Sequence, residues 1–184
     1  MNILLFIFCY LVILISILGY GLFFIKILDK RLGEKNYGYV GLFGLLIVII
    51  YSYLSNVLIA HSEIHNSLFI FLGVIFFIYK NPKKKLLQNK NEILLTIAIF
   101  LLLLSSLFIF KNHDDFPYYH FPYTHYLTQQ SFVFGIGQLN HGFRTPSSIF
   151  YLNSLFFLPL AKSYLFNLGA LYFFGFTNII LLKK

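Results

Sequence analysis

The chain has 184 residues, of which 59% are hydrophobic and 11% are charged, and its mean hydropathy is +0.78. Soluble domains are roughly half apolar, so this composition excludes an ordinary soluble domain and predicts an integral membrane protein. The net charge of +8 does not indicate nucleic-acid binding, because the basic residues gather in short segments between apolar runs, where orientation in a membrane explains them.

Four apolar runs follow one another in the first 110 residues, and each predicts a transmembrane helix, which needs roughly 20 mostly apolar residues to cross a bilayer. No basic residue precedes the first run, and it is longer than the apolar region of a cleaved signal peptide, so we expect it to be retained. The third run is short and needs residues at its edges to cross. The runs are residues 3–28, 38–60, 67–79 and 93–110.

The basic residues predict which side of the membrane each connection faces. They lie mainly in two connections, between the first and second runs and between the third and fourth, so we expect both to be cytoplasmic. We then expect three parts of the chain to face outward: the N-terminus, the polar turn at residues 61–66 and everything after residue 110. The expected location is a bacterial plasma membrane. The basic residues are Lys26, Lys30, Arg31, Lys35, Lys80, Lys83, Lys84, Lys85 and Lys90.

The apolar tail at residues 149–182 permits two interpretations. In the first, residues 163–182 cross once and residues 147–161 form a helix on the outer surface, with Pro159 and Lys162 at the bend. In the second, the tail makes two cramped spans. The predicted fold class is therefore an all-α polytopic protein with about five transmembrane helices and short interfacial helices, or with six spans. Gly38, Gly41 and Gly44 are expected to ease helix packing.

The outer loop at residues 111–148 holds the residues best suited to chemistry. Asp114 and Asp115 are adjacent carboxylates in a chain with only six acidic residues, and their repulsion calls for a cation, a proton or a catalytic role. Pro117 and Pro122 predict an extended or turned segment at residues 114–121, followed by an amphipathic surface helix with Tyr123, Tyr126 and Leu127 on one face.

Later in this loop, His141 and Arg144 precede a proline-initiated helix, and this predicts a corner that could hold a phosphate. Such a loop suits a lipid-linked phosphate substrate. A carboxylate can take a proton from an acceptor hydroxyl, a cation can balance the leaving phosphate, and aromatic rings can stack on a sugar. His61 and His65 have i, i+4 spacing and are predicted to face the same side as Asp114. A shared metal site and an ordinary polar turn both remain open for them.

An acidic pair followed closely by Tyr118 and Tyr119 in the first large outer loop resembles the glycosyltransferase-C superfamily, which includes protein mannosyltransferases and aminoarabinose transferases. His141 and the Arg144-Thr145-Pro146 stretch loosely resemble its His-Pro-Pro-like element. The resemblance spans residues 93–182 and implies transfer of a sugar from a polyprenyl-phosphate donor. It implies that Asp114 or Asp115 is the general base or binds a divalent cation, Mg or Mn.

The stretch Asp-Asp-Phe-Pro-Tyr-Tyr also resembles that of uncharacterised bacterial multi-spanning membrane proteins. We therefore divide the chain into a three-span region at residues 1–92 and a glycosyltransferase-like region at residues 93–184, and expect a fragment of a longer protein. Two other functions stay open, a non-catalytic assembly or scaffold subunit and a transporter subunit. Spans two to four have no charged residue in their cores, which gives a conduction path little support.

Overall fold

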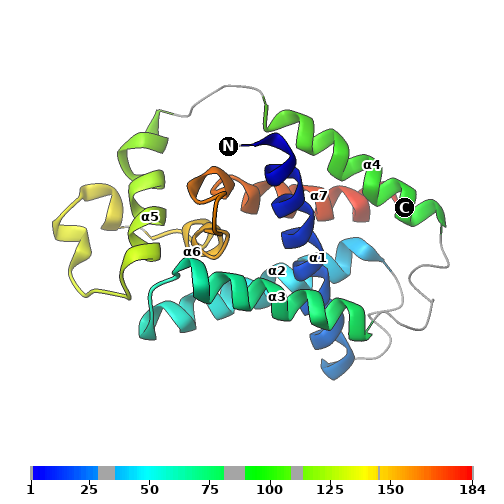
Figure 1. Cartoon of the computed structure of the whole chain (residues 1–184), viewed down its shortest axis with the longest axis horizontal. Helices are drawn as coiled ribbons and strands as arrows, with labels where there is room; N and C mark the ends of the chain where they lie inside the picture. The colour runs from blue at the N-terminus through cyan, green and yellow to red at the C-terminus, as the bar shows by residue number, and fades with distance from the viewer. Residues whose placement is uncertain (1, 29–35, 81–89, 109–113, 145, 184) are drawn as a thin grey trace. The chain divides into compact units, whose positions relative to one another are not determined.

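A computed structural model describes the chain except for residues 1, 29–35, 81–89, 109–113, 145 and 184 (Figure 1). The described residues form helices and no strand, apart from an isolated bridge between Leu158 and Lys162. This confirms the predicted all-α class. The α-helices are α1 (Ile3–Leu28), α2 (Tyr37–Leu58), α3 (Glu63–Lys80), α4 (Lys90–Ser106), α5 (Phe121–Gln129), α6 (Ser148–Ser154) and α7 (Leu168–Leu182).

Among the described residues, three helical segments are long and apolar enough to cross a membrane. They are Ile3–Ile27, Tyr37–Leu58 and Ser163–Leu182, and they lie close to the boundaries of three predicted spans. The helices α3 and α4 are shorter, with 18 and 17 residues. At 1.5 Å per residue they extend about 27 and 25 Å, slightly less than the hydrocarbon core of about 30 Å. A crossing by α3 and α4 therefore stays a prediction.

The tail separates into a short helix and a segment long enough to span a membrane. Helix α6 has seven residues, or roughly 10 Å of length, and is too short to cross a bilayer. After it the chain turns sharply, with Lys162 N–H donating to Leu158 O at 2.7 Å and with positive φ at Leu160 and Lys162. The predicted bend near Pro159 and Lys162 is present, and the helix lengths disfavour the six-span interpretation.

The chain forms two compact units that interleave along the sequence. Unit 1 contains residues 1–11, 48–69 and 111–169, and unit 2 contains residues 12–47, 70–110 and 170–184. The predicted division after residue 92 rests on the resemblance to the superfamily and not on how the chain packs. It stays a prediction.

Unit 2 is held together by close contacts at glycines. A Cβ on Gly44 would lie 2.0 Å from the carbonyl oxygen of Ile17, and one on Gly41 would lie 2.1 Å from the ring of Phe176. Only a residue without a side chain lets α2 approach α1 and α7 this closely, as is common between membrane helices. The packing role predicted for Gly38, Gly41 and Gly44 is confirmed.

Glu92, in the first turn of α4, joins three chain segments at one end of unit 2. Its buried carboxylate accepts a hydrogen bond from the backbone N–H of Tyr37 at 2.7 Å and forms an ion pair with Lys183 Nζ at 2.6 Å. The starts of α2 and α4 and the end of α7 therefore share one end of the unit. The predicted topology requires this, since it puts both basic connections and the C-terminus on one side. Outside the described residues lie Lys30, Arg31, Lys35, Lys83, Lys84 and Lys85.

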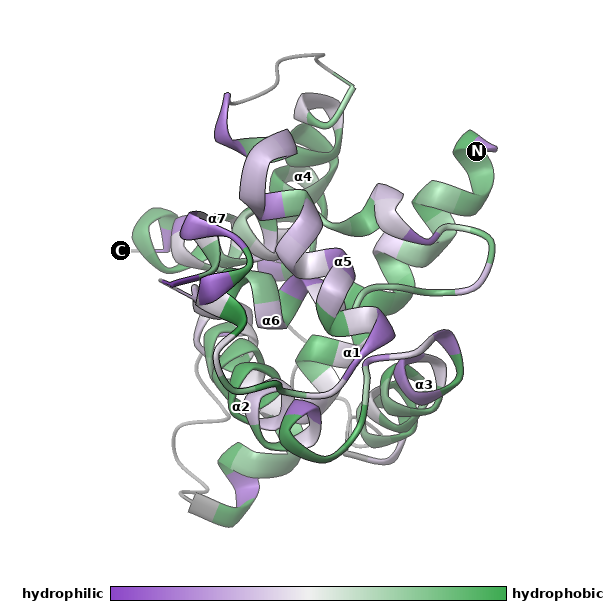
Figure 2. Ribbon diagram, turned by 90° about the vertical axis from the view of Figure 1, so that its left-hand side faces the viewer, coloured by the Kyte–Doolittle hydropathy of each residue, from purple (hydrophilic) through white to green (hydrophobic). Residues whose placement is uncertain are grey.

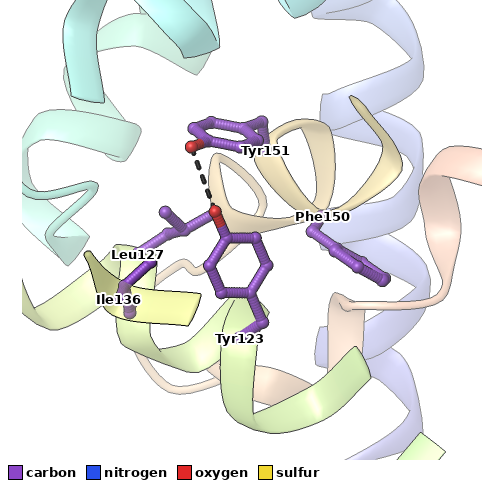
Figure 3. Packing of buried hydrophobic residues seen from close by; sticks show 5 residues of the cluster. All are labelled: Tyr123, Leu127, Ile136, Phe150 and Tyr151. Atoms are coloured by element: carbon purple, nitrogen blue, oxygen red, sulfur yellow. Dashed lines mark hydrogen bonds between the residues drawn. The ribbon is translucent and has the colours of Figure 1, made fainter. Parts of the chain in front are cut away.

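Unit 1 is built around α5 and α6. Figure 2 shows α5 mainly in the pale and purple tones of polar residues. Its buried face packs Tyr123 and Leu127 against Ile136, Phe150 and Tyr151 (Figure 3). The phenol oxygens of Tyr123 and Tyr151 are hydrogen-bonded at 3.2 Å. The predicted apolar face of α5 is thus present at its two main positions.

The prediction of an extended or turned segment at residues 114–121 holds for the turn at Asp114 and is wrong from Asp115 on. The helix predicted to begin near Pro122 is confirmed, since α5 begins at Phe121. Asp115 has helical dihedral angles, a π-helix, η2, covers Phe116–His120, and α5 follows without a break. Pro122 has no N–H to donate to the preceding turn. The π-helix directly before it has hydrogen bonds between residues five apart, and Phe121 N–H donates to Phe116 O. The carbonyl of Tyr118, four residues before Pro122, instead accepts a hydrogen bond from Asn140 Nδ2 at 3.3 Å.

Candidate functional site

The predicted acidic pair lies at the entry to η2. Asp114 is exposed and makes no hydrogen bond in the described structure, whereas Asp115 is half-buried at the N-cap position of η2. The hydroxyl of Tyr119 donates to Asp115 Oδ2 at 3.3 Å. Partial desolvation and the Asp115 carboxylate raise the pKa of Tyr119, so the phenol keeps its proton and can orient the carboxylate. Tyr118 points away, with 72% of its surface exposed.

The other predicted residues lie on η4 (His141–Arg144), which packs directly against η2. A Cβ on Gly142 would lie 2.4 Å from the Cβ of Tyr119, so the two backbones approach closely at this point. The bond from Asn140 Nδ2 to Tyr118 O adds a second tie. Two segments about 25 residues apart are thereby brought into contact, and the acid-and-tyrosine segment meets the segment that carries the predicted phosphate corner.

Arg144 is held by its inner nitrogen, with Nε donating to Gly137 O at 3.2 Å. Its side chain is exposed, and its two terminal nitrogens have no partner among the described residues. Such an arginine presents a planar pair of donors that matches the oxygens of a phosphate or carboxylate. His141 is exposed on the same turn.

An open hollow of about 390 Å³ adjoins Arg144. Its lining is mostly aromatic and aliphatic, with Arg144 as its only charged residue among those described. The ring of Tyr123 at its base belongs to the buried cluster of Figure 3. Burial raises the pKa of Tyr123, which keeps this phenol neutral. The residues that line the hollow are Tyr123, Phe132, Val133, Phe134, Gly135, Ile136, Gly137, Gln138, Phe143, Arg144 and Pro146.

A second group of polar residues surrounds His61, between α2 and α3. His61 has no exposed surface, and its Nδ1 lies 2.6 Å from the hydroxyl of Ser154 while its Nε2 lies 2.9 Å from that of Ser55. Because Ser154 donates its proton to Tyr151 O at 2.8 Å, it must accept from His61 Nδ1–H. Nε2 is then the acceptor, and it takes the proton of Ser55, whose other acceptor, Ser52 O, lies farther away at 3.4 Å. Both ring nitrogens are thereby satisfied in the neutral form.

His65 and Asn66 extend this group. The ring of His65 stacks on that of His61 at 5.5 Å, and its Nε2 lies 2.8 Å from the hydroxyl of Tyr51. Asn66 is fully buried, and its Nδ2 donates to the carbonyls of His61, Ser154 and Phe157 at 2.8 to 3.0 Å. Desolvation, assisted by the neighbouring His65, lowers the pKa of His61 from 6.5 to about 3. We call His61, His65, Asn66, Ser55 and Ser154 the histidine network.

The predicted metal sites at the acidic pair and at His61 and His65 stay predictions. Among the described residues no group of three His, Cys, Asp or Glu side chains lies close enough to hold an ion. Both ring nitrogens of His61 are already engaged in hydrogen bonds to protein hydroxyls, so the shared site with Asp114 has no free ligand there. The spacing of His61 and His65 drew attention to this turn, but no local pattern points to Ser55 or Ser154 as partners.

The whole chain, residues 1–184, matches the family model described as "Domain of unknown function (DUF8201)", so the protein belongs to that family. No curated protein and no solved structure shows a significant match.

Proposed function

We propose that this member of a family without assigned function is a membrane glycosyltransferase, which transfers a sugar from a polyprenyl-phosphate donor at the outer face of a bacterial plasma membrane. The observation that carries the proposal is the packing of η4 on η2 beside the hollow. It unites a carboxylate segment, an arginine with free donors and an apolar hollow, the three features that an amphiphilic phosphate donor requires.

Arg144 is the proposed contact to the donor phosphate. Its Nε is already bonded to Gly137 O, so the guanidinium is oriented before the ligand arrives and loses little freedom on binding. His141 lies on the same turn and can donate a second hydrogen bond. The apolar side chains of the hollow suit the first isoprene units of the lipid, since burial of hydrocarbon contributes roughly 25 cal/mol per Å².

The acidic pair is the proposed general base. Asp114, exposed and without a hydrogen-bond partner, takes the proton of the acceptor hydroxyl, while Asp115 is oriented by Tyr119. The acceptor oxygen then forms a bond to the anomeric carbon of the sugar. The bond from that carbon to the phosphate oxygen breaks, and its electrons leave with the polyprenyl phosphate, whose charge Arg144 balances. Tyr118 and Tyr119 offer ring faces to the sugar.

The predicted topology agrees with this location. Glu92 joins the starts of α2 and α4 to Lys183 at the end of α7, which supports one common side for the basic connections and the C-terminus. The polar turn of the histidine network bonds to α5 through His61 N–H and Leu127 O at 3.0 Å. The turn and the loop that carries Asp114 are thereby joined within unit 1, as expected if both face outward.

The test is sugar transfer by the full chain in membrane vesicles, supplied with polyprenyl-phosphate-linked ¹⁴C-glucose, ¹⁴C-mannose or ¹⁴C-aminoarabinose. Asp114→Asn and Asp115→Asn remove each carboxylate at nearly constant volume, and loss of a general base lowers rates by roughly 10² to 10⁴. Glu63→Gln is the matched control, since it makes the same chemical change outside the site. Transfer that is unchanged in both aspartate variants would remove them from catalysis.

A further inference from the structure

The connection between α5 and α6 exposes an unusual amount of apolar surface. Residues 131–140 contain no charged side chain, and Phe134 and Leu139 expose 90% and 79% of their surfaces. Phe132 and Val133 are also exposed, at 39% and 41%. We call Phe132, Val133, Phe134 and Leu139 the apolar tip. Consecutive exposed apolar side chains, such as those at residues 132–134, mark a contact with another apolar phase.

The stretch at residues 132–134 of the apolar tip is held in place on both sides. At its start, Phe132 N–H donates to Asn56 O at 2.8 Å, and after Phe134 the buried side chain of Ile136 packs into the Tyr123 cluster. Gly135 makes the turn between them with φ of 81°, a left-handed conformation that side chains rarely adopt. The rings of Phe132 and Phe134 pack edge to face at 5.0 Å. The apolar residues are thus presented outward by anchored backbone.

The anchor at Asn56 indicates which apolar phase the tip meets. Asn56 lies in the last turn of α2, a helix long and apolar enough to span a membrane. The neighbouring side chains Leu54, Val57 and Leu58 are exposed, as expected for a helix that faces lipid. The backbone of the tip is bonded to this turn and therefore lies at the level where the span ends. The polar residues Ser131, Gln138 and Asn140 flank it.

We propose that the apolar tip inserts into the outer leaflet of the bilayer beside the end of α2. Three of its residues, Phe132, Val133 and Phe134, also form one wall of the hollow next to Arg144. Insertion therefore joins the hollow to the lipid phase, so that a lipid reaches Arg144 from within the leaflet rather than through water. Insertion of the tip requires that α2 spans the membrane, but it does not require that the protein transfers a sugar.

The chain contains no tryptophan, so one introduced tryptophan reports its own surroundings without background. Phe134→Trp places the reporter at the most exposed tip position, and Leu139→Trp is a second reporter on the other side of the turn. Leu46→Trp, at an exposed position in the middle of α2, is the reference for the bilayer interior. Gln129→Trp, at an exposed position at the end of α5 and outside the lining of the hollow, is the polar reference. The full-length variants are reconstituted in phosphatidylcholine vesicles with or without brominated acyl chains.

We expect the tryptophans at positions 134 and 139 to emit at short wavelength and to lose most of their fluorescence in brominated vesicles, as at position 46. Aqueous iodide should quench them much less than it quenches position 129. Strong iodide quenching without bromine quenching would overturn the proposal, because the tip would lie in water. Shielding from both quenchers would also overturn it, because a second copy or another protein would then cover the tip.

Discussion

The two polar groups of unit 1 differ in how completely their hydrogen-bonding capacity is used. In the histidine network the ring nitrogens of His61 both have partners, and the amide of Asn66 bonds to three carbonyls. Where η4 packs on η2, Asp114 is exposed and Arg144 keeps its terminal nitrogens unpaired among the described residues. A fully satisfied buried network stabilises a fold, whereas open donors and acceptors at the surface are available to a ligand.

The strongest test of this contrast is Asn66→Ala. The substitution removes the donor shared by three carbonyls at a position with no exposed surface, so buried acceptors lose their partner. We expect a loss of about 2–4 kcal/mol in the free energy of unfolding. The measurement is denaturant unfolding in lipid bicelles. Gln129→Ala removes an exposed amide and should change the free energy by less than about 0.5 kcal/mol. Equal effects would refute the contrast.

A somewhat smaller loss is expected for Gly142→Ala, which disturbs the contact of η4 with η2. The new methyl group would lie 2.4 Å from the Cβ of Tyr119, so the backbone of η4 or of η2 must shift to make room for it. We expect a loss of about 1–3 kcal/mol in the same unfolding measurement, together with reduced sugar transfer. Gln129→Ala, at an exposed position outside the lining of the hollow, is again the control. Full stability and full transfer in Gly142→Ala would show that this contact does not shape the site.

The histidine network also predicts a pH dependence. Burial lowers the pKa of His61 to about 3 in the folded protein, while in the unfolded chain it stays near 6.5. Between these values the unfolded chain binds more protons, so the free energy of unfolding rises with pH by up to about 1.4 kcal/mol per unit. The slope should end above pH 6.5. The slope is measured from unfolding curves of the wild type and of His61→Asn between pH 4 and 7. An identical slope in both proteins would show that His61 is not the source of the pH dependence.

The smallest effect on stability is expected at Arg144. Arg144→Ala removes an exposed side chain with one hydrogen bond, and the free energy of unfolding should change by less than about 0.5 kcal/mol. Binding of decaprenyl phosphate should nevertheless weaken by roughly 10- to 100-fold, since a hydrogen bond to a charged group contributes about 1.5–3 kcal/mol. Titration of the labelled lipid in nanodiscs measures this. Lys162→Gln removes another exposed cation and should bind the lipid as the wild type does. Equal weakening in both variants would show that Arg144 acts only through its charge and not through a specific contact.

The sequence by itself determined the features that depend on local pattern. Long apolar runs predict helices because backbone polar groups would have no other partners in lipid, and α1, α2 and the helical segment at residues 163–182 lie close to their predicted limits. The small size of glycine likewise predicted the packing role of Gly41 and Gly44. The acidic pair was visible because charge is rare in this chain.

Only the tertiary structure decided how distant residues complete one another's hydrogen bonds. Pro122 predicted a break in the helix, yet the helix continues through a π-turn. The carbonyl of Tyr118, which Pro122 cannot serve as a donor, accepts a hydrogen bond from Asn140, 22 residues away. His61 depends on Ser154, 93 residues away. No local pattern encodes such a pairing, because a hydroxyl is suited equally to water or to a neighbouring carbonyl until the folded chain brings an imidazole within reach.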